Sequence, residues 1–505
     1  MAKYSLIVVG SGTAGIIAAT LAKYIYKLDL EVILISDSKT PSIGVGESLT
    51  PVFTRYLDFV GISKEELIQN ANCTIKLGLK FKNWKNDGKH YYHGFDSKAL
   101  IRDPSVMGSH SFNLAATYDI IHNQYELDRM YDPYFYENCV LPNMNVGMTN
   151  FYSLHIDATL FSKYVENKFK KDLTIIDDFV QDVIVDEKTN TIKELVLKKK
   201  GKIKADFYID ASGFAAVLMS KLKNKWVDKT DWLPLNRFIP NPVPTKHAKL
   251  PNYTTSEATD DGWILQVPLQ NRWGSGYLYS SEFTTDEQAF KKFNIWSKTN
   301  YNSKVKSDKV LKFESGYWQD GWVGNCLSVG LSHGFAEPLE ATNIHQVVDQ
   351  LLKFFFTFNF QILNYDVNNY NSFLRKYMEN IFLYLRYCYC TDRTDSKFWK
   401  YMTNNVPDVV KDLDEKSKNF VFNYIDLPTE YVFSYHNFTA VAYGLGKYEN
   451  SKQKMYDVMV TKNQLKAAKD YSDKTNDLKT AYKSLKLYDH KQYIDHVVTY
   501  GFGPT

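Results

Sequence analysis

Three short segments of the chain carry residues whose types and spacing could do chemistry. The first, Gly10-Ser11-Gly12-Thr13-Ala14-Gly15, fits the G-x-G-x-x-G pattern of a turn between a strand and a helix. Such glycines permit a tight turn, close approach of backbone to a pyrophosphate, and packing of the helix on the strand, so this segment predicts a dinucleotide site. The N-terminus of the following helix would offer N–H groups and a positive dipole end to the phosphates. The other two segments are Ile43-Gly44-Val45-Gly46-Glu47 and Glu337-Pro338-Leu339-Glu340-Ala341-Thr342.

The contact to the ribose is less regular in this sequence. An acidic residue is expected about 20 residues after the glycines, at the end of the second strand. Ser36 occupies that position and Asp37 follows it, so either side chain could bind the ribose. Asp210-Ala211-Ser212-Gly213, which follows a short apolar run, resembles a second flavin-enzyme motif whose backbone closes over the adenosine half. A purely structural turn explains this last segment equally well.

The elements that must position these residues follow from hydrophobic periodicity. Tyr4 to Val9 is an apolar run typical of a parallel strand, Ile16 to Ile25 has helical character, and Leu30 to Ile35 reads as a second strand. Together they predict a βαβ unit of about the usual 30 residues. Further strands are expected in a hairpin over Thr174 to Leu197, at Phe207 to Ile209, in a pair over Trp263 to Tyr279 and at Cys326 to Gly330. Beyond Ile344 the pattern is helical nearly to the end of the chain.

Composition excludes several classes of protein. A chain of 505 residues is too long for one compact core, so two or three modules are expected. A net charge of +4 without block asymmetry argues against nucleic-acid binding, and the densest basic run, Lys198-Lys199-Lys200-Gly201-Lys202, reads as a solvated hairpin tip. The five Cys lack metal-ligand spacing, so we predict no metal site and a reduced, cytoplasmic protein. No run reaches the roughly 18 apolar residues that span a bilayer, and no signal peptide is recognisable at the N-terminus.

With these residues in view, the chain resembles the flavin-dependent tryptophan halogenase family. The resemblance is collinear over most of the first 350 residues. It runs through Gly10 to Gly15, Ile43 to Glu47, Ile75 to Trp84, Tyr91 to Phe95, Asp210 to Phe214, Gly262 to Ser280 and Val329 to Ile344. Seven motifs in one order make a chance match untenable.

The resemblance implies an α/β fold with two interleaved modules. A Rossmann-like FAD-binding module of the flavin monooxygenase type would take its elements from residues near 4–50, 150–220 and 320–350. A β-sheet substrate module would use residues near 75–145 and 225–320. Residues 351–505 would form a mainly helical region that covers the substrate.

The resemblance also implies the reaction and its partners. Reduced FAD, supplied by a separate NAD(P)H-dependent flavin reductase, would react with oxygen and a halide ion to give hypohalous acid. The acid would pass through an internal tunnel to an electron-rich aromatic small molecule. Such isolation matters because free hypohalous acid attacks any exposed nucleophile. The sequence allows a homo-oligomer and indicates neither a nucleic acid nor a membrane as partner.

Residue roles can be carried over onto the matching positions. Lys76 matches the essential lysine that hydrogen-bonds hypohalous acid or carries the halogen, although an exposed strand lysine is the plain alternative and Lys80 a competing candidate. Glu340 matches the carboxylate that takes the ring proton. The alternative is a carboxylate that only stabilises the N-terminus of a helix. The halide would lie on backbone N–H groups of Thr342 and Asn343, and the aromatic pocket would include His93 and Phe95. The cofactor-binding residues would be Gly10, Gly12, Thr13, Ala14, Gly15, Ser36, Asp37, Gly44, Val45, Gly46, Glu47, Asp210, Gly213 and Gly330.

Three departures from the family pattern affect specificity. Asn343 stands where the family usually has Gly; because Asn tolerates a left-handed backbone, the N–H nest would survive with a changed shape and an open halide preference. Leu265 replaces the second Trp of the family's W-x-W-x-I-P signature, which keeps a flavin-dependent monooxygenase as an alternative function. The chain beyond about Tyr365 lacks a recognisable set for gripping free tryptophan, so we expect another indole, a phenol or an azole.

Two rival functions follow from these departures. A single-component monooxygenase would need a second nicotinamide-binding motif, and Gly444-Leu445-Gly446 follows no convincing βαβ strand. A non-catalytic flavin-binding protein on the same scaffold would have no need to keep Lys76 and Glu340. The sequence therefore favours a flavin-dependent halogenase over both.

Overall fold

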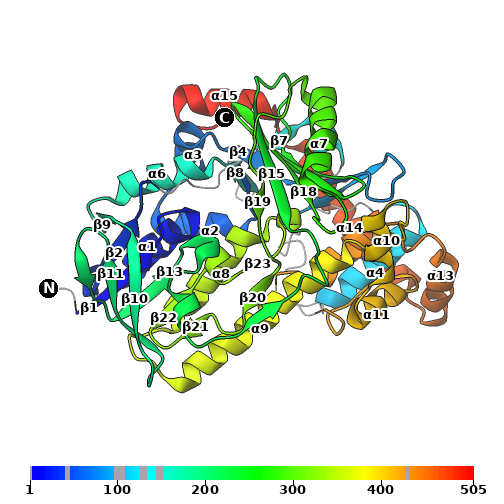
Figure 1. Cartoon of the computed structure of the whole chain (residues 1–505). Helices are drawn as coiled ribbons and strands as arrows, with labels where there is room; N and C mark the ends of the chain where they lie inside the picture. The colour runs from blue at the N-terminus through cyan, green and yellow to red at the C-terminus, as the bar shows by residue number, and fades with distance from the viewer. Residues whose placement is uncertain are drawn as a thin grey trace. The chain divides into compact units, whose positions relative to one another are not determined.

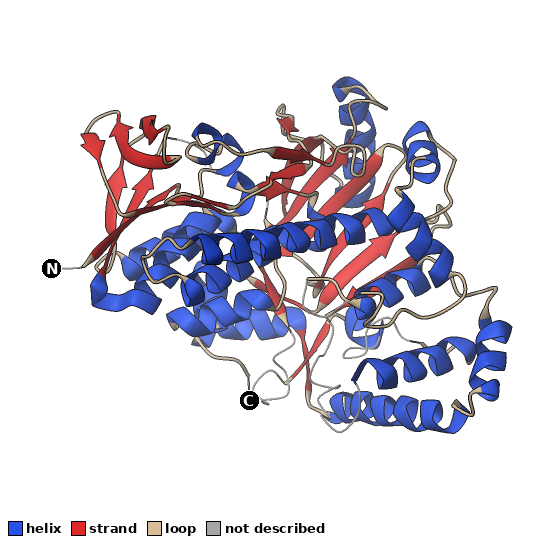
Figure 2. Ribbon diagram, turned by 90° about the horizontal axis from the view of Figure 1, so that it is seen from below, coloured by secondary structure: helices blue, strands red, loops and turns tan. Residues whose placement is uncertain are grey.

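The computed structural model describes residues 3–39, 46–95, 108–125, 133–143, 152–427 and 432–504. Within it the chain divides into two compact units, each assembled from three separate segments. The described chain contains both helices and strands (Figure 2), and each unit includes elements of both kinds. The first comprises Met1–Cys73, Ser153–Asn236 and Leu311–Glu379, and the second Thr74–Tyr152, Arg237–Val310 and Asn380–Thr505.

A six-stranded sheet forms the centre of the first unit. Its order is β21-β22-β13-β1-β2-β9, and β1 is parallel to both of its neighbours. The inner strands are apolar and buried on both faces, as parallel strands require. The bounds are β1 (Tyr4–Val9), β2 (Leu30–Ser36), β9 (Thr174–Asp177), β13 (Phe207–Asp210), β21 (Trp322–Val323) and β22 (Cys326–Ser328).

The predicted βαβ unit is confirmed. Between β1, which lies next to the marked N-terminus in Figure 1, and β2 the chain forms α1 (Thr13–Tyr26), which packs on β2 and on α8 (Thr342–Thr357). Because β1, β2, β13 and β22 are parallel, their carboxyl ends meet at one edge of the sheet. That edge brings together the glycine turn, Ser36, Asp210 and the loop after Ser328.

A small antiparallel sheet completes this part of the first unit. It consists of β10 (Val180–Asp186), β11 (Thr191–Leu197) and β12 (Gly201–Ile203), so the hairpin predicted over Thr174 to Leu197 is present from Val180 onward. Its apolar side chains, Leu195 among them, join one hydrophobic core with Ile7 and Tyr208 of the parallel sheet. Further elements of the unit are β3 (Glu47–Ser48), β8 (Ser153–Ile156), β14 (Trp226–Asp228), β20 (Gly316–Trp318), β23 (Gly334–Phe335), α2 (Val52–Val60), α3 (Lys64–Asn70) and α6 (Ala158–Phe169).

The second unit is organised around a larger sheet. The strands that belong to this unit run in the order β15-β18-β17-β16-β5-β6, antiparallel except for the parallel pair β16 and β5. Helix α7 (Asp286–Tyr301) covers one face through Phe293, which packs with Ile264 and Tyr277. The bounds are β5 (Gly78–Lys82), β6 (His90–Gly94), β15 (Arg237–Pro244), β16 (Tyr253–Ala258), β17 (Gly262–Leu269) and β18 (Arg272–Tyr279).

The expected helical region beyond residue 351 is shared between the units. Helix α9 (Asn364–Tyr387) crosses their boundary at Glu379, and the later helices belong to the second unit. No helix in the described ranges combines the length and apolar character that a bilayer crossing requires. The remaining elements of the second unit are β4 (Thr74–Lys76), β7 (Val140–Pro142), β24 (Leu487–Asp489), α4 (Gly108–Ile121), α5 (Pro133–Asn138), α10 (Lys397–Asn404), α11 (Asp408–Ser417), α12 (Tyr435–Gly444), α13 (Lys452–Thr461), α14 (Leu465–Ser484) and α15 (His490–Tyr500).

Candidate functional site

The turn between β1 and α1 has the geometry of a phosphate cradle. A Cβ on Gly15 would lie 1.8 Å from the Gly10 carbonyl oxygen, and a Cβ on Gly10 would lie 2.3 Å from the Ala211 carbonyl oxygen, so both positions require glycine. Gly12 has no atom within 4 Å of its Cβ position, which leaves open space above the turn. No side chain caps α1, and its first turn, which includes Thr13 and Ala14, contains no acidic residue. The first N–H groups of the helix can therefore face an anion.

The predicted ribose residues lie at the end of β2, beside this turn. The hydroxyl groups of Ser36 and Ser11 are 2.6 Å apart, which ties the end of β2 to the glycine turn. Asp37 accepts a hydrogen bond from the Lys39 backbone N–H at 3.2 Å. The arrangement places both candidates where a ribose is expected, and the choice between them stays a prediction.

Asp210 uses its buried carboxylate to build the adjacent loop. It accepts hydrogen bonds from the N–H and hydroxyl of Ser212, at 3.0 and 2.6 Å, and from the N–H groups of Leu218 and Met219, both at 2.8 Å. Gly213 follows with φ +72° and no atom within 4 Å of its Cβ position. The carboxylate thus shapes the loop, and the open backbone at Gly213 is the part that could approach a cofactor.

Glu47 brings a buried carboxyl to the glycine turn. Its Oε1 accepts a hydrogen bond from the Thr13 hydroxyl at 3.3 Å, whereas Oε2 is buried with no hydrogen-bond partner among the described residues. Burial raises the pKa of Glu47 to about 7. An orphaned oxygen beside an open glycine turn fits a polar cofactor, so the residues present suit the dinucleotide that the sequence predicts. Gly46 precedes it with φ +119°, while Gly44 and Val45 lie outside the described residues.

The loop after β22 reaches the same end of α1. Gly330 has φ +60°, and a Cβ there would lie 3.2 Å from the Ala14 Cβ. A short 3-10 turn, η5 (Pro338–Glu340), ends at Glu340, which is only 3% exposed. The loop therefore carries a buried carboxyl into the part of the first unit that holds the glycine turn.

The candidate halide site lies at the start of α8. Thr342 and Asn343 are the first two residues of this helix, whose N-terminus has no side-chain cap, and N–H groups there can bind an anion. The tolerance of Asn for a left-handed backbone is not called on at position 343. Ala341 takes that conformation instead, with φ +58°, and Asn343 is helical. The nest can therefore form without glycine at 343.

Lys76 is the last residue of β4 and is completely buried. The alternative of an exposed strand lysine is therefore wrong. Its Nζ lies 5.0 Å from the centroid of the Phe95 ring, a distance typical of a cation–π contact. Lys80, the competing candidate, lies over Tyr92 and Tyr253 in β5, and partial burial lowers its pKa. Of the two lysines, only Lys76 contacts a predicted pocket residue.

His93 is held on both sides of its ring. Its Nδ1 lies 3.2 Å from the Tyr384 hydroxyl and its Nε2 lies 3.3 Å from the Asn437 side-chain nitrogen. With the Asn437 amide donating to Nε2, the ring hydrogen lies on Nδ1 and is donated to Tyr384. Tyr384 in turn stacks on Phe433, with ring centroids 3.7 Å apart. A ring fixed in this way can form a pocket wall but is poorly placed to move protons.

His490 is a positioning residue that sequence reasoning missed. Its Nε2 accepts a hydrogen bond from the Ile75 backbone N–H at 3.0 Å, and its Nδ1 contacts the Leu250 carbonyl oxygen at 3.1 Å. Burial lowers the pKa of His490 to about 4, so the ring is neutral and can accept. The first residue of α15 thereby fixes the strand residue next to Lys76. Tyr384 and Asn437 were missed as well, since Asn437 has the spacing of a helix cap with Ser434.

The predicted residues fall into two groups. The described cofactor and halide residues and Glu340 belong to the first unit, whereas Lys76, His93 and Phe95 belong to the second. No cluster of three or more His, Cys, Asp or Glu suited to a metal occurs in the described part of the chain. The geometry thus offers a dinucleotide cradle with an adjacent anion site in one unit and a buried lysine with aromatic walls in the other.

Comparison with known proteins agrees with this geometry. A sequence model of a family described as tryptophan halogenase matches residues 5–461. Tryptophan 6-halogenase SttH of Streptomyces toxytricini is 28% identical over 467 residues, covering 86% of each chain. Tryptophan 7-halogenase RebH of Lentzea aerocolonigenes is 28% identical over 424 residues, covering 78% of each chain.

Solved structures show the same fold. The structure of SttH covers 98% of this chain and 100% of its own, with a TM-score of 0.82 and 23% identity. Xcc4156, a flavin-dependent halogenase from Xanthomonas campestris, covers 98% of this chain and 99% of its own, with a TM-score of 0.84 and 22% identity. The mixed α/β architecture expected from the sequence is therefore confirmed.

Proposed function

The chain belongs to the tryptophan halogenase family, and from this premise we propose that it halogenates an electron-rich aromatic small molecule other than free tryptophan. As a flavin-dependent halogenase it is an oxidoreductase that uses FAD. The observation that carries the proposal is the completely buried Lys76 beside the Phe95 ring. A lysine is costly to bury, and a site for handling a reactive electrophile explains why one is buried here.

Oxygen is the oxidant of the proposed reaction. Bound as reduced FAD, the cofactor would supply the electrons with which oxygen converts halide and a proton to hypohalous acid and water. The aromatic substrate then gains the halogen at carbon and loses a ring proton, and the hydroxyl of hypohalous acid leaves as a second water. A separate NAD(P)H-dependent reductase would reduce the FAD.

Lys76 has the role of activating hypohalous acid. Its ammonium group can donate a hydrogen bond to the oxygen that leaves, or its amine can accept the halogen and release it to the ring. The Phe95 ring beside Nζ and the fixed His93 ring supply flat walls for an aromatic substrate and exclude water. These contacts favour attack on the ring over reaction of the acid with solvent.

The first unit supplies the remaining roles. Glu340 accepts the ring proton, for which a buried carboxylate is suited, and the N–H groups of Thr342 and Asn343 hold the halide. The glycine turn, Glu47 and Gly213 bind FAD. These assignments rest on the resemblance and are supported by the burial and contacts of the residues named.

The proposal is tested by mass spectrometry of products from a panel of indoles, phenols and azoles. The protein is supplied with FAD, NADH, an unrelated flavin reductase, oxygen and either chloride, bromide or iodide. We expect a halide-dependent mass shift that disappears in Lys76→Ala. Lys80→Ala is the matched control, because Lys80 also lies against aromatic rings and should retain at least about half of the activity, within the small range of surface substitutions.

Flavin oxidation provides the second readout. Lys76→Ala should still bind FAD and oxidise it with oxygen at the wild-type rate, because the cofactor residues lie in the other unit. Unchanged halogenation in Lys76→Ala would disprove the lysine assignment. Oxygen insertion that does not depend on halide would instead establish the monooxygenase alternative raised by Leu265.

A further inference from the structure

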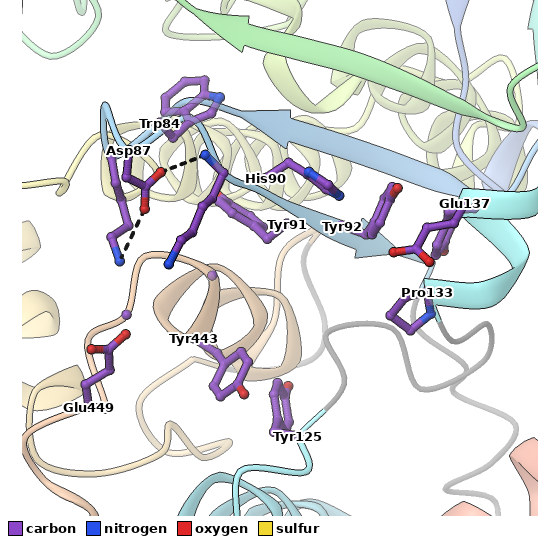
Figure 3. A pocket seen from close by; sticks show the side chains of 15 residues that line it. Trp84, Asp87, His90, Tyr91, Tyr92, Tyr125, Pro133, Glu137, Tyr443 and Glu449 are labelled. Atoms are coloured by element: carbon purple, nitrogen blue, oxygen red, sulfur yellow. Dashed lines mark hydrogen bonds and ion pairs between the residues drawn. The ribbon is translucent and has the colours of Figure 1, made fainter.

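A groove of about 390 Å³ runs beside β6 in the second unit. Its walls include the rings of Tyr91, Tyr92, Tyr125 and Tyr443, and charged side chains such as Glu137 and Glu449 line its rim. Figure 3 shows Tyr91 and Tyr92 on the strand, with Tyr443 and Tyr125 facing them across the groove. An aromatic floor with a polar rim resembles the anatomy of a surface that binds a polypeptide.

Residues that line the groove share β6 and α12 with His93 and its partner Asn437. Tyr91 and Tyr92 immediately precede His93 in β6, and Tyr443 lies in the same helix, α12, as Asn437, the partner of His93. From His93 to Tyr91 the strand rises about 6.6 Å, and from Asn437 to Tyr443 the helix rises about 9 Å. A molecule whose ring lies at His93 would therefore need only a short extension to enter the groove.

The edge of β6 offers backbone hydrogen bonds to such an extension. β6 is the last strand of its sheet in the described part of the chain, paired only with β5. Asn83 N–H donates to the Lys89 carbonyl at 2.8 Å, and Phe95 N–H donates to the Leu77 carbonyl at 3.4 Å. Because bonded pairs alternate along an antiparallel ladder, the N–H and C=O groups of His90 and Tyr92 point away from β5.

We propose that the groove binds an extended, peptide-like part of the substrate, which pairs with the outer edge of β6. This inference rests on the proposed function and names its substrate class: an aromatic residue within a peptide or an amide-linked conjugate. Strand addition at a free edge takes its affinity from main-chain hydrogen bonds and its selectivity from alternate side chains. Alternate side chains of the added strand would face the rings of Tyr91 and Tyr92.

The walls of the groove favour a single strand over a second copy of the protein. An exposed edge can also pair with the same edge of another molecule. Here Tyr125 and Tyr443 stand across the groove from β6, so a second sheet could not approach without displacing them. A lone extended chain fits between these walls and can still use the outward groups of His90 and Tyr92.

Binding to the flavin-free protein tests the inference without turnover. The probe is the acetylated, amidated peptide Gly-Gly-Trp-Gly-Gly, compared with N-acetyltryptophanamide and with peptides N-methylated at one glycine amide each. Isothermal titration should give a tighter Kd for the peptide than for N-acetyltryptophanamide. At least one N-methylated peptide should lose roughly 2- to 12-fold in affinity, the range expected for one hydrogen bond.

His90→Pro removes one outward donor from the edge. Proline lacks the N–H and is tolerated on edge strands, and the His90 N–H is not used in the pairing with β5. His90→Ala is the matched control, since it keeps the N–H and loses the same exposed side chain. Because the His90 ring also lines the groove, the comparison is between the two variants, and we expect His90→Pro to bind the peptide roughly 2- to 12-fold more weakly than His90→Ala. Tyr443→Ala, compared with Tyr443→Phe, tests the opposite wall if the proline variant is unstable.

Three results would overturn the inference. They are equal affinity for the peptide and N-acetyltryptophanamide, insensitivity to all N-methylation, or an edge that proves by sedimentation to be a dimer contact abolished by His90→Pro. If small indoles are halogenated but the peptide does not bind, only this inference fails. If the peptide binds as expected but no aromatic compound is ever halogenated, the proposed function fails instead.

Discussion

At the scale of single residues, the candidate site collects ionisable groups that the fold buries. Lys76 and Glu340 are at most 3% exposed, and one oxygen of Glu47 is buried without a hydrogen-bond partner among the described residues. Burying an ionised group costs several kcal/mol unless it is compensated. Such groups are concentrated where a cofactor and a reactive electrophile are expected, which is where unfavourable burial is most easily explained by function.

Glu47→Gln should change how stability depends on pH. The folded-state pKa of Glu47 is raised from 4.5 to about 7, so the folded protein resists ionisation that the unfolded chain permits. Below pH 4.5 the raised pKa does not affect stability. As the pH rises to 7 and above, it lowers the free energy of unfolding by up to about 3 kcal/mol. Flavin-free Glu47→Gln should therefore gain stability relative to wild type between pH 4.5 and 8.

Urea unfolding of the flavin-free protein at several pH values measures this effect. Glu187→Gln is the control, because the Glu187 side chain is 79% exposed. The control should differ from wild type by the same small amount throughout the range. A stability difference between Glu47→Gln and wild type that is constant from pH 4.5 to 8 would show that Glu47 does not titrate as its burial implies.

At the scale of elements, the turn between β1 and α1 uses glycine for two different reasons. Gly15 is needed for packing of the protein, and Gly12 is expected to be needed for access of the cofactor. Gly15→Ala would place a Cβ 1.8 Å from the Gly10 carbonyl oxygen, so the variant should lose about 1 to 3 kcal/mol of stability through overpacking. Gly12→Ala meets no protein atom within 4 Å and has an ordinary φ of −67°, so it should fold as wild type does. Its Cβ would occupy the path of the pyrophosphate, and FAD affinity should fall roughly tenfold or more.

Thermal unfolding and FAD titration distinguish the two variants. Gly12→Ala should keep the wild-type melting temperature while its FAD Kd rises, and Gly15→Ala should melt earlier even without FAD. If Gly12→Ala bound FAD as tightly as wild type, the open space above the turn would not be where the phosphates bind. The two variants serve as each other's controls because they lie three residues apart in one turn.

Local elements could be predicted from the sequence because their causes are local. The apolar run of β1, the glycines and the helical periodicity of α1 lie within about 30 residues, and the structure confirms all three. The end of β2 at Ser36 and the loop at Asp210 were placed for the same reason. The region of Asn343 shows the limit of such reasoning, since the left-handed residue is Ala341, two positions earlier.

The surroundings of Lys76 could not be predicted in this way. The partners of His93 lie 291 and 344 residues away along the chain, and the His490 contact to Ile75 spans 415 residues. Pairings over such distances leave no trace in hydrophobic periodicity or residue spacing. A single sequence could therefore name Lys76 only through family resemblance.

At the scale of the whole molecule, each unit is built from three segments separated by segments of the other. Neither unit can be excised as one continuous fragment. In the second unit the last segment supports the first, because His490 near the C-terminus holds Ile75 beside Lys76. Loss of the last 16 residues would therefore remove a contact to the strand that carries the candidate catalytic residue.

The same histidine should make the molecule sensitive to acid. Burial lowers the folded-state pKa of His490 from 6.5 to about 4, so the unfolded chain binds a proton that the folded protein resists. The stability that depends on neutral His490 is fully present above pH 6.5 and is lost as pH falls toward 4, by up to about 3 kcal/mol. His490→Gln, which cannot titrate, should show a shallower loss of unfolding free energy over that range, whereas His122→Gln, at an exposed histidine, should follow wild type. Equal slopes for His490→Gln and wild type in urea unfolding from pH 8 to 4 would mean that α15 does not depend on a neutral imidazole to hold β4.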